Sequence, residues 1–247
     1  MLYVYGIHPV EELLRRSPAA IHQIAVAGTL KEVQFETIQE LVKPAKIHVQ
    51  KVSEKELDEW CDGGNHQRIA ARVEEFPYST LEEILEKVAQ KPQACLLALA
   101  QVQDPGNLGA ILRSAAAMNV DGVLLPRHRA ASVTPAVVRA SAGMAFQLPI
   151  AEVPNLAKTL TDLKEQGFWI AGTVARDGQD LWTMDWDLKV ALVMGGEHKG
   201  MRPGVEKTCD FRLQIPLESD VESLNVSVAA AITLYERRRF LHTLASS

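Results

Sequence analysis

The chain has 247 residues, of which 47% are hydrophobic and 23% charged, proportions that are ordinary for a soluble globular protein with a full core. The formal net charge of −5 argues against a protein that coats nucleic acid indiscriminately, because nonspecific binding depends on cationic contacts with phosphates. No stretch approaches the ~20 apolar residues of a membrane span and no leader pattern opens the chain, so we expect a cytoplasmic protein.

Helical and strand patterns alternate along the first 75 residues. The helical segments are 9–16, 32–42 and one that opens at Ser53, and the strand segments are 22–27, 46–52 and 69–76. The sequence therefore predicts a small α/β domain over residues 1–75. The next segment, 76–92, is predicted as a linker with one helix, since Thr80 and Glu83 have the spacing of a capping box and Pro92 lies just beyond the helix end.

The remaining residues, 93–247, carry longer apolar strand patterns. They are ACLLALAQV from Ala94, GVLLP from Gly122, FWIAGTV from Phe168, VALVM from Val190 and FRLQIP from Phe211. Helical segments long enough for crossovers lie between most of them, so we expect a mostly parallel sheet covered on both faces. Ligands of such sheets lie beyond the carboxyl ends of the strands.

Three strands in this second part end in unusual loops. In the first, QDPGNLGAILRSAAAMNV from Gln103, a strand leads into a helix of small residues with Asn107 at or near its start. Asn107 could simply cap this helix and Arg113 could simply reach solvent. Against this, Gly109 and the alanines make the helix thin enough for close approach by another group.

The second loop, in VALVMGGEHKGMRP, contains Gly195, Gly196 and Gly200 around Glu197. Three glycines so close indicate backbone that approaches a ligand, although a tight turn would also use them. Met201 and Arg202 stand where a P-loop has Lys and Ser or Thr. The chain also lacks GxGxxG, which disfavours a dinucleotide fold and the common Rossmann-type methyltransferase.

The third loop lies in LQIPLESDVESLNVSVAAAITLYERRR, where a strand ending near Ile215 leads into a long final helix. Ser223 and Asn225 lie at or just inside its start, where capping is an equally good explanation. The small residues 227–231 predict close packing against another backbone. Basic residues form two clusters, one between Asp121 and Glu152, where no acid occurs, and one at 237–239; they are either solvated or in contact with phosphates.

Taken together and in this order, the three segments resemble the three motifs of the SpoU (TrmH-type) RNA 2′-O-methyltransferases of the SPOUT superfamily. The first domain, with GIHPVEELLR and HQRIAARV, also resembles the substrate-binding domain of the family's ribosomal RNA members. The likeness covers nearly the whole chain. It implies a trefoil knot in the carboxyl-terminal part and a homodimer formed largely through the knotted region.

The resemblance also implies S-adenosylmethionine as cofactor and RNA as partner, with 23S ribosomal RNA and guanosine favoured and transfer RNA as the alternative. A non-catalytic RNA-binding protein on this scaffold is a further alternative, disfavoured because the polar motif residues are all present. The family's catalytic positions match Arg113, Asn107, Glu197, Ser223 and Asn225, and its cofactor positions match Gly195, Gly196, Gly200, Ile215 and Leu224.

Arg113 is the leading catalytic residue of that set. In the family this arginine is proposed to be the general base. A guanidinium stays protonated, however, because its pKa lies above about 12. We therefore expect a positioning and electrostatic role for Arg113. Candidates for RNA backbone contacts are Arg127, Arg129 and Arg139. The chain departs from its relatives at His198, Lys199 and the AGMAF segment from Ala142, which puts the identity of the RNA in doubt. The sequence shows no metal-binding constellation, so no metal is expected, and the scattered Cys61, Cys95 and Cys209 are expected to be reduced packing residues.

Overall fold

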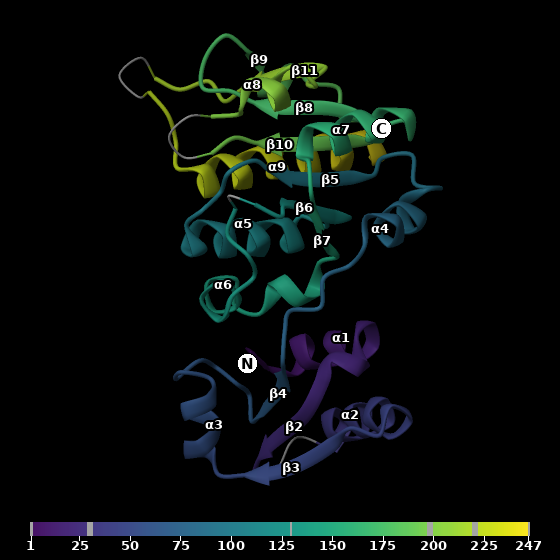
Figure 1. Cartoon of the computed structure of the whole chain (residues 1–247), viewed down its shortest axis with the longest axis vertical. Helices are drawn as coiled ribbons and strands as arrows, with labels where there is room; N and C mark the ends of the chain where they lie inside the picture. The colour runs from purple at the N-terminus through teal and green to yellow at the C-terminus, as the bar shows by residue number, and fades with distance from the viewer. Residues whose placement is uncertain (1, 29–31, 129, 197–199, 219–221, 247) are drawn as a thin grey trace. The chain divides into compact units, whose positions relative to one another are not determined.

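The computed structural model describes residues 2–28, 32–128, 130–196, 200–218 and 222–246. The chain folds into two compact units (Figure 1). The first consists of Met1–Pro77 and Val133–Gln147, and the second of Tyr78–Ser132 and Leu148–Ser247. No described helix has the length and apolar character that crossing a bilayer would require.

The first unit is built on a four-stranded sheet of order β1-β4-β2-β3, in which β2 and β3 are parallel and the other pairs antiparallel. Its elements are β1 (Leu2–Tyr5), α1 (Ile7–Arg16), η1 (Pro18–Ala20), β2 (Ile21–Ala27), α2 (Glu32–Ala45), β3 (His48–Val52), α3 (Glu54–Trp60), β4 (Ile69–Val73), α6 (Pro135–Ala140) and η2 (Met144–Gln147). The predicted small α/β domain is confirmed. The helix predicted to open at Ser53 is α3, whose capping box joins Ser53 and Glu56.

The second unit contains a seven-stranded sheet of order β7-β6-β5-β10-β8-β11-β9, and every pair recorded in it is parallel. Its strands are β5 (Cys95–Leu99), β6 (Gly122–Pro126), β7 (Ile150–Val153), β8 (Trp169–Thr173), β9 (Gln179–Asp180), β10 (Val190–Met194) and β11 (Phe211–Gln214). Its helices are α4 (Leu81–Val88), α5 (Pro105–Ala117), α7 (Leu156–Glu165), η3 (Leu181–Thr183), α8 (Pro203–Glu206) and α9 (Val226–Ala245).

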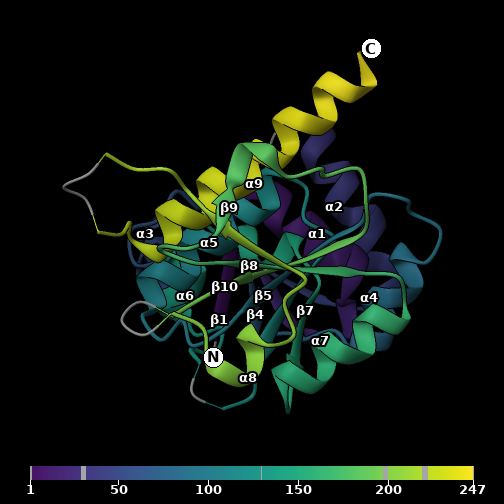
Figure 2. The ribbon, with the colours of Figure 1, turned by 90° about the horizontal axis from the view of Figure 1, so that it is seen from above.

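Helices cover both faces of this sheet, as predicted (Figure 2). On one face, Ile84 of α4, Leu160 of α7 and Val205 of α8 share a buried cluster with alternate strand residues such as Leu96. On the other face, α5 packs against α9. Strands β5 and β10 are buried at every position, which agrees with their uninterrupted apolar sequences. The sheet therefore brings the carboxyl ends of its strands to one edge, where the three motif loops begin.

Candidate active site

The first motif helix, α5, is capped by Asp104 rather than by Asn107. The carboxylate of Asp104 accepts the backbone N–H of Asn107 at 2.7 Å, and Pro105 fills the first helical position, where its missing N–H costs nothing. The interpretation of Asn107 as a cap is therefore wrong. Its side chain serves another contact.

That contact is with Asn225, 118 residues further along the chain. Asn225 is the N-cap of α9, and its Oδ1 accepts from the backbone N–H of Ser227 at 2.8 Å and from the Ser227 hydroxyl at 2.6 Å. Its Nδ2 donates to Oδ1 of Asn107 at 3.0 Å. Capping is thus correct for Asn225, but the same amide also joins the starts of α5 and α9. The two small-residue helices pack against each other.

A cavity of about 410 Å³ lies at the carboxyl edge of the sheet, beside this junction. Residues of the second and third motif loops line it together: Gly195, Gly196, Gly200, Ile215, Ser223 and Leu224. The structure therefore gathers at one cavity every residue that the sequence marked for cofactor binding. Asn107, Asn225 and the exposed Arg113 are not among its lining residues.

The glycines allow the second loop to fold tightly against itself. Gly196 and Gly200 exchange backbone hydrogen bonds of 3.0 and 3.2 Å, and Gly200 has a φ of +61°. A Cβ atom on Gly195 would lie 2.9 Å from the carbonyl carbon of Gly200, closer than side chains come to backbone. The tight turn between Gly196 and Gly200 therefore forms part of the wall of the cavity.

The cavity also uses residues that the sequence did not single out, from the loop that follows β8. Thr173, Val174, Ala175 and Arg176 line it, and Nη2 of Arg176 lies 3.8 Å from a carboxylate oxygen of Glu222 on the third motif loop. The signal was present, because Phe168–Val174 reads as a strand of a parallel sheet and ligands lie beyond the carboxyl ends of such strands. The cavity thus combines apolar walls, hydroxyl groups, one ion pair and exposed backbone.

The predicted RNA-contact residues are distributed over both units. Arg127 is exposed directly after β6 in the second unit. Arg139 is exposed on α6 in the first unit, with its Nε 3.7 Å from a carboxylate oxygen of Asp62. Glu197 and Arg129 lie outside the described residues, as do His198 and Lys199.

The three cysteines are free thiols whose surroundings oppose ionisation. Burial raises the pKa of Cys61 to about 12 and those of Cys95 and Cys209 to about 11. Near neutral pH all three therefore stay protonated, which makes them poor nucleophiles. They act as packing residues, as predicted.

Comparison with known proteins identifies the two parts of the chain separately. Residues 94–235 match the model of the SpoU rRNA Methylase family, and residues 3–79 match a model described as RNA 2′-O ribose methyltransferase substrate binding. The 23S rRNA (guanosine-2′-O-)-methyltransferase RlmB of Pseudomonas aeruginosa is 39% identical, over 94% of this chain and 94% of its own.

Solved structures agree with these sequence matches. The crystal structure of an AdoMet-bound rRNA methyltransferase from Sinorhizobium meliloti aligns with a TM-score of 0.78 and 26% identity, over 97% of this chain and 87% of that one. The crystal structure of the A. aeolicus TrmH/SpoU tRNA modifying enzyme aligns with a TM-score of 0.58 and 25% identity, over 67% of this chain and 86% of that one.

Proposed function

The chain belongs to the SpoU rRNA methylase family of RNA methyltransferases, and on that premise we propose that it transfers a methyl group from S-adenosylmethionine to a ribose 2′-hydroxyl of 23S ribosomal RNA, with guanosine favoured. The observation that carries this proposal is the cavity at which the second and third motif loops meet, beside the bond between Asn107 and Asn225. Both loops contribute lining residues to that one cavity.

The residues around the cavity fit S-adenosylmethionine. The volume lies within the range of about 300–1,000 Å³ that is usual for small-molecule sites. Gly195 and Gly196 line the cavity with backbone, and their missing side chains let the loop pack closely against Gly200 and Gln101. Ile215 and Leu224 supply apolar surface for a planar base. The cofactor supplies a methyl group already activated by its sulfonium, so the protein has mainly to align a ribose oxygen and help it lose its proton.

Arg113 is assigned a positioning and electrostatic role. Arginine remains protonated near neutral pH, so it suits contact with a phosphate or a developing alkoxide better than proton abstraction. Asn107, Asn225, Ser223 and Glu197 would orient the ribose and the guanidinium by hydrogen bonds. Arg113 is not a lining residue of the cavity in its own chain, which agrees with a site that draws on two subunits.

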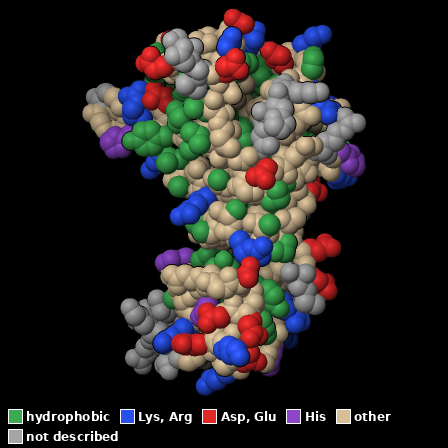
Figure 3. All heavy atoms as spheres, turned by 90° about the vertical axis from the view of Figure 1, so that its left-hand side faces the viewer, with side chains coloured by type: hydrophobic (Ala, Val, Ile, Leu, Met, Phe, Trp, Pro, Cys, Tyr) green, Lys and Arg blue, Asp and Glu red, His purple; other side chains and the backbone are tan. Residues whose placement is uncertain are grey.

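A homodimer is part of this proposal. Three large apolar side chains are exposed along one face of α9, with Val228 at 45%, Ile232 at 39% and Tyr235 at 60%, and their spacing of four and three residues is that of one helix face. Figure 3 shows hydrophobic side chains gathered on the surface of the unit that carries α9. Large apolar side chains exposed together on one helix face favour an interface with a second copy. The trefoil knot also remains a proposal, supported by the insertion of β10 between β5 and β8, both of which precede it in the chain.

Ribosomal RNA is favoured over transfer RNA because of the first unit. The match to the 23S rRNA enzyme covers 94% of this chain and so includes that unit, whereas the match to the tRNA modifying enzyme covers 67%. Arg127, Arg129 and Arg139 would contact the phosphates of the RNA, and with Arg139 in the first unit both units would take part.

The test uses radiolabelled S-adenosylmethionine with ribosomal RNA and, separately, transfer RNA from a strain that lacks the gene. We expect label in alkali-resistant dinucleotides of ribosomal RNA alone. Arg113→Ala should lower the rate at least 100-fold, while Arg212→Ala, which removes another exposed arginine, should not. Arg113→Lys should lower the rate without changing the slope of the pH-rate profile, whereas a base role requires a changed slope. Label in transfer RNA alone would replace the substrate, and a protein that binds no S-adenosylmethionine would end the proposal.

A further inference from the structure

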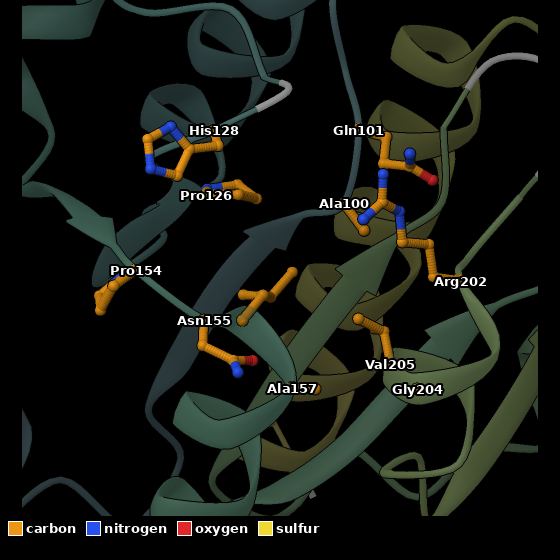
Figure 4. A pocket seen from close by; sticks show the side chains of 11 residues that line it. Ala100, Gln101, Pro126, His128, Pro154, Asn155, Ala157, Arg202, Gly204 and Val205 are labelled. Carbon is orange, nitrogen blue, oxygen red and sulfur yellow. The ribbon is translucent and has the colours of Figure 1, made fainter.

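The second unit contains another cavity, of about 780 Å³, beyond the carboxyl ends of β5, β6 and β7 (Figure 4). Its walls come from the loop after β5, the loop after β6, the start of α7 and α8. The residues that matter for its chemistry are Gln101, Pro126, His128, Asn155, Leu156 and Arg202. None of them was assigned a role by the sequence motifs or belongs to the lining of the cavity assigned to the cofactor.

One end of this cavity is formed by a fixed guanidinium group. Gln101 lies beside Arg202 (Figure 4), and with its amide oxygen turned toward the guanidinium it accepts from Nε at 3.0 Å and from Nη2 at 3.1 Å. The two bonds hold the guanidinium in one plane. Because the amide is neutral, they leave its positive charge available to an anion. His128 lies across the cavity from Arg202, adding a second group that can face a phosphate.

The rest of the cavity is an apolar slot with a polar wall. Pro126, Leu156 and Val205 provide apolar surface. Asn155 is the N-cap of α7, and its Oδ1 accepts from the backbone N–H of Lys158 at 3.1 Å. The amide group that Asn155 can present to a ligand is therefore its donating NH₂ end. A guanidinium plane and hydrogen-bonding side chains that reach the edges of a base are among the groups with which proteins hold unstacked nucleotides of single-stranded RNA. In this cavity they lie beside apolar surface.

The two cavities share a wall. Gly196 lines the cofactor cavity, and a Cβ atom on it would lie 3.0 Å from both the Cβ atom and the carbonyl oxygen of Gln101, which lines the second cavity. Gln101 also stands three residues before Asp104, the cap of the first motif helix. A ligand in the second cavity is thus the neighbour of a substrate in the proposed methyl-transfer site.

We propose that the second cavity holds the base of an unpaired nucleotide of the RNA substrate, one that neighbours the methylated ribose, with its phosphate at Arg202. This inference rests on the proposed function, since it needs RNA as the substrate. It assigns to Asn155 and Arg202 the selection of a single-stranded target, because a base held in a duplex cannot enter the slot.

Binding measurements separate this inference from the methylation reaction. The probe is a fluorescent ten-nucleotide RNA of mixed sequence, used alone and as a duplex, and binding is followed by anisotropy. Two variants alter the cavity. In Gly204→Leu the added Cβ meets no atom within 4 Å, and the rest of the side chain takes up volume of the cavity. Asn155→Ser keeps a side chain that can cap α7 but loses the amide donor. Gly204→Ala is the matched control, because it adds a Cβ without filling the cavity.

We expect both variants to weaken binding of the single strand at least tenfold, with duplex binding and the Kd for S-adenosylmethionine changed less than twofold and the Gly204→Ala control like the wild type. Unchanged single-strand binding, or an equal loss for single strand and duplex, would overturn the inference. A second result would also overturn it: the wild type and Gly204→Leu bind RNA equally, but only the wild type binds guanosine monophosphate. The cavity would then be a mononucleotide site. If RNA binds as expected but no RNA is methylated, the proposed function fails and the base-holding role stands.

Discussion

Asn225 shows how one side chain can serve both stability and function. Its oxygen caps α9 through Ser227, and its nitrogen donates to Asn107 on α5. Loss of an N-cap Asn costs about 0.5–2 kcal/mol when alanine replaces it. The cap contributes to the stability of the helix, whereas the bond to Asn107 contributes to the geometry of the proposed active site.

These two roles can be separated by substitution. Asn225→Ser keeps an oxygen that can cap the helix but removes the donor to Asn107, so we expect the free energy of unfolding to fall by less than about 0.5 kcal/mol. The kcat should fall at least tenfold, because the polar residues at the starts of α5 and α9 lose their fixed arrangement. Asn225→Ala should show the same loss of kcat and an added loss of about 1 kcal/mol. Denaturant unfolding and single-turnover methylation measure the two quantities.

Thr80→Ala is the control for the capping effect, since Thr80 caps α4 through the backbone N–H of Glu83 at 3.2 Å. It should cost about 1 kcal/mol of stability and leave kcat unchanged. If Asn225→Ser retains full kcat, the bond between the two asparagines has no part in the reaction.

At the scale of single residues, the sequence predicted part of this site. The glycines stood out because they follow a strand pattern, and the resemblance to the family's motifs added Ile215, Ser223 and Leu224. All of them line one cavity. The cap of α5 was misassigned because Asp104 and Asn107 both have capping side chains, and only backbone geometry decides between them. The residues at the end of β8 and just after it, Thr173 to Arg176, were missed because the strand pattern that predicts their position is followed by no glycine-rich loop or motif.

Among the elements, we expect the loop between β10 and α8 to affect cofactor binding most, because its glycines line the cavity. Gly195→Ala would place a Cβ 2.9 Å from the backbone of Gly200, and backbone cannot yield as a flexible side chain does. We expect the loop to open, the Kd for S-adenosylmethionine to rise at least tenfold and stability to fall by about 1–3 kcal/mol. Isothermal titration calorimetry measures the first effect and denaturant unfolding the second.

Gly204→Ala, in α8, is the control for this loop, since a Cβ there meets nothing within 4 Å. Its Kd for S-adenosylmethionine should match that of the wild type. An unchanged Kd for Gly195→Ala would show that the close approach of Gly195 to Gly200 plays no part in holding the cofactor.

Among the elements, strands with a continuous apolar sequence were predictable, whereas β1, β7 and β9 were not. The predicted strands at Gly122 and Val190 match β6 and β10, because each is a continuous buried run. By contrast, β1, β7 and β9 have four, four and two residues, and they are strands because neighbouring strands pair with them. Residues 133–147 lie in sequence between β6 and β7 of the second unit but pack with the first, a tertiary choice with no local signal.

For the whole molecule, the exposed face of α9 leads to a prediction of oligomeric state. This face exposes three large apolar side chains to water, those of Val228, Ile232 and Tyr235. They lie on the helix whose N-cap, Asn225, is hydrogen-bonded to Asn107. A dimer that covers this face would place the partner subunit against the helix that begins at the active site. We therefore expect wild-type protein to have twice the 27.2 kDa mass of one chain in light scattering.

The double variant Ile232→Asp and Tyr235→Ser should convert the protein to a monomer, since a carboxylate buried without a partner costs several kcal/mol. Its methylation rate should fall with the loss of the dimer, while its Kd for S-adenosylmethionine changes less because the cavity residues are untouched. Val49→Asp, at an exposed apolar residue of the first unit, should leave both mass and rate as they were. A double variant that remains at twice the mass of one chain would place the interface elsewhere, and the position of Arg113 outside the cavity would then need an explanation within a single chain.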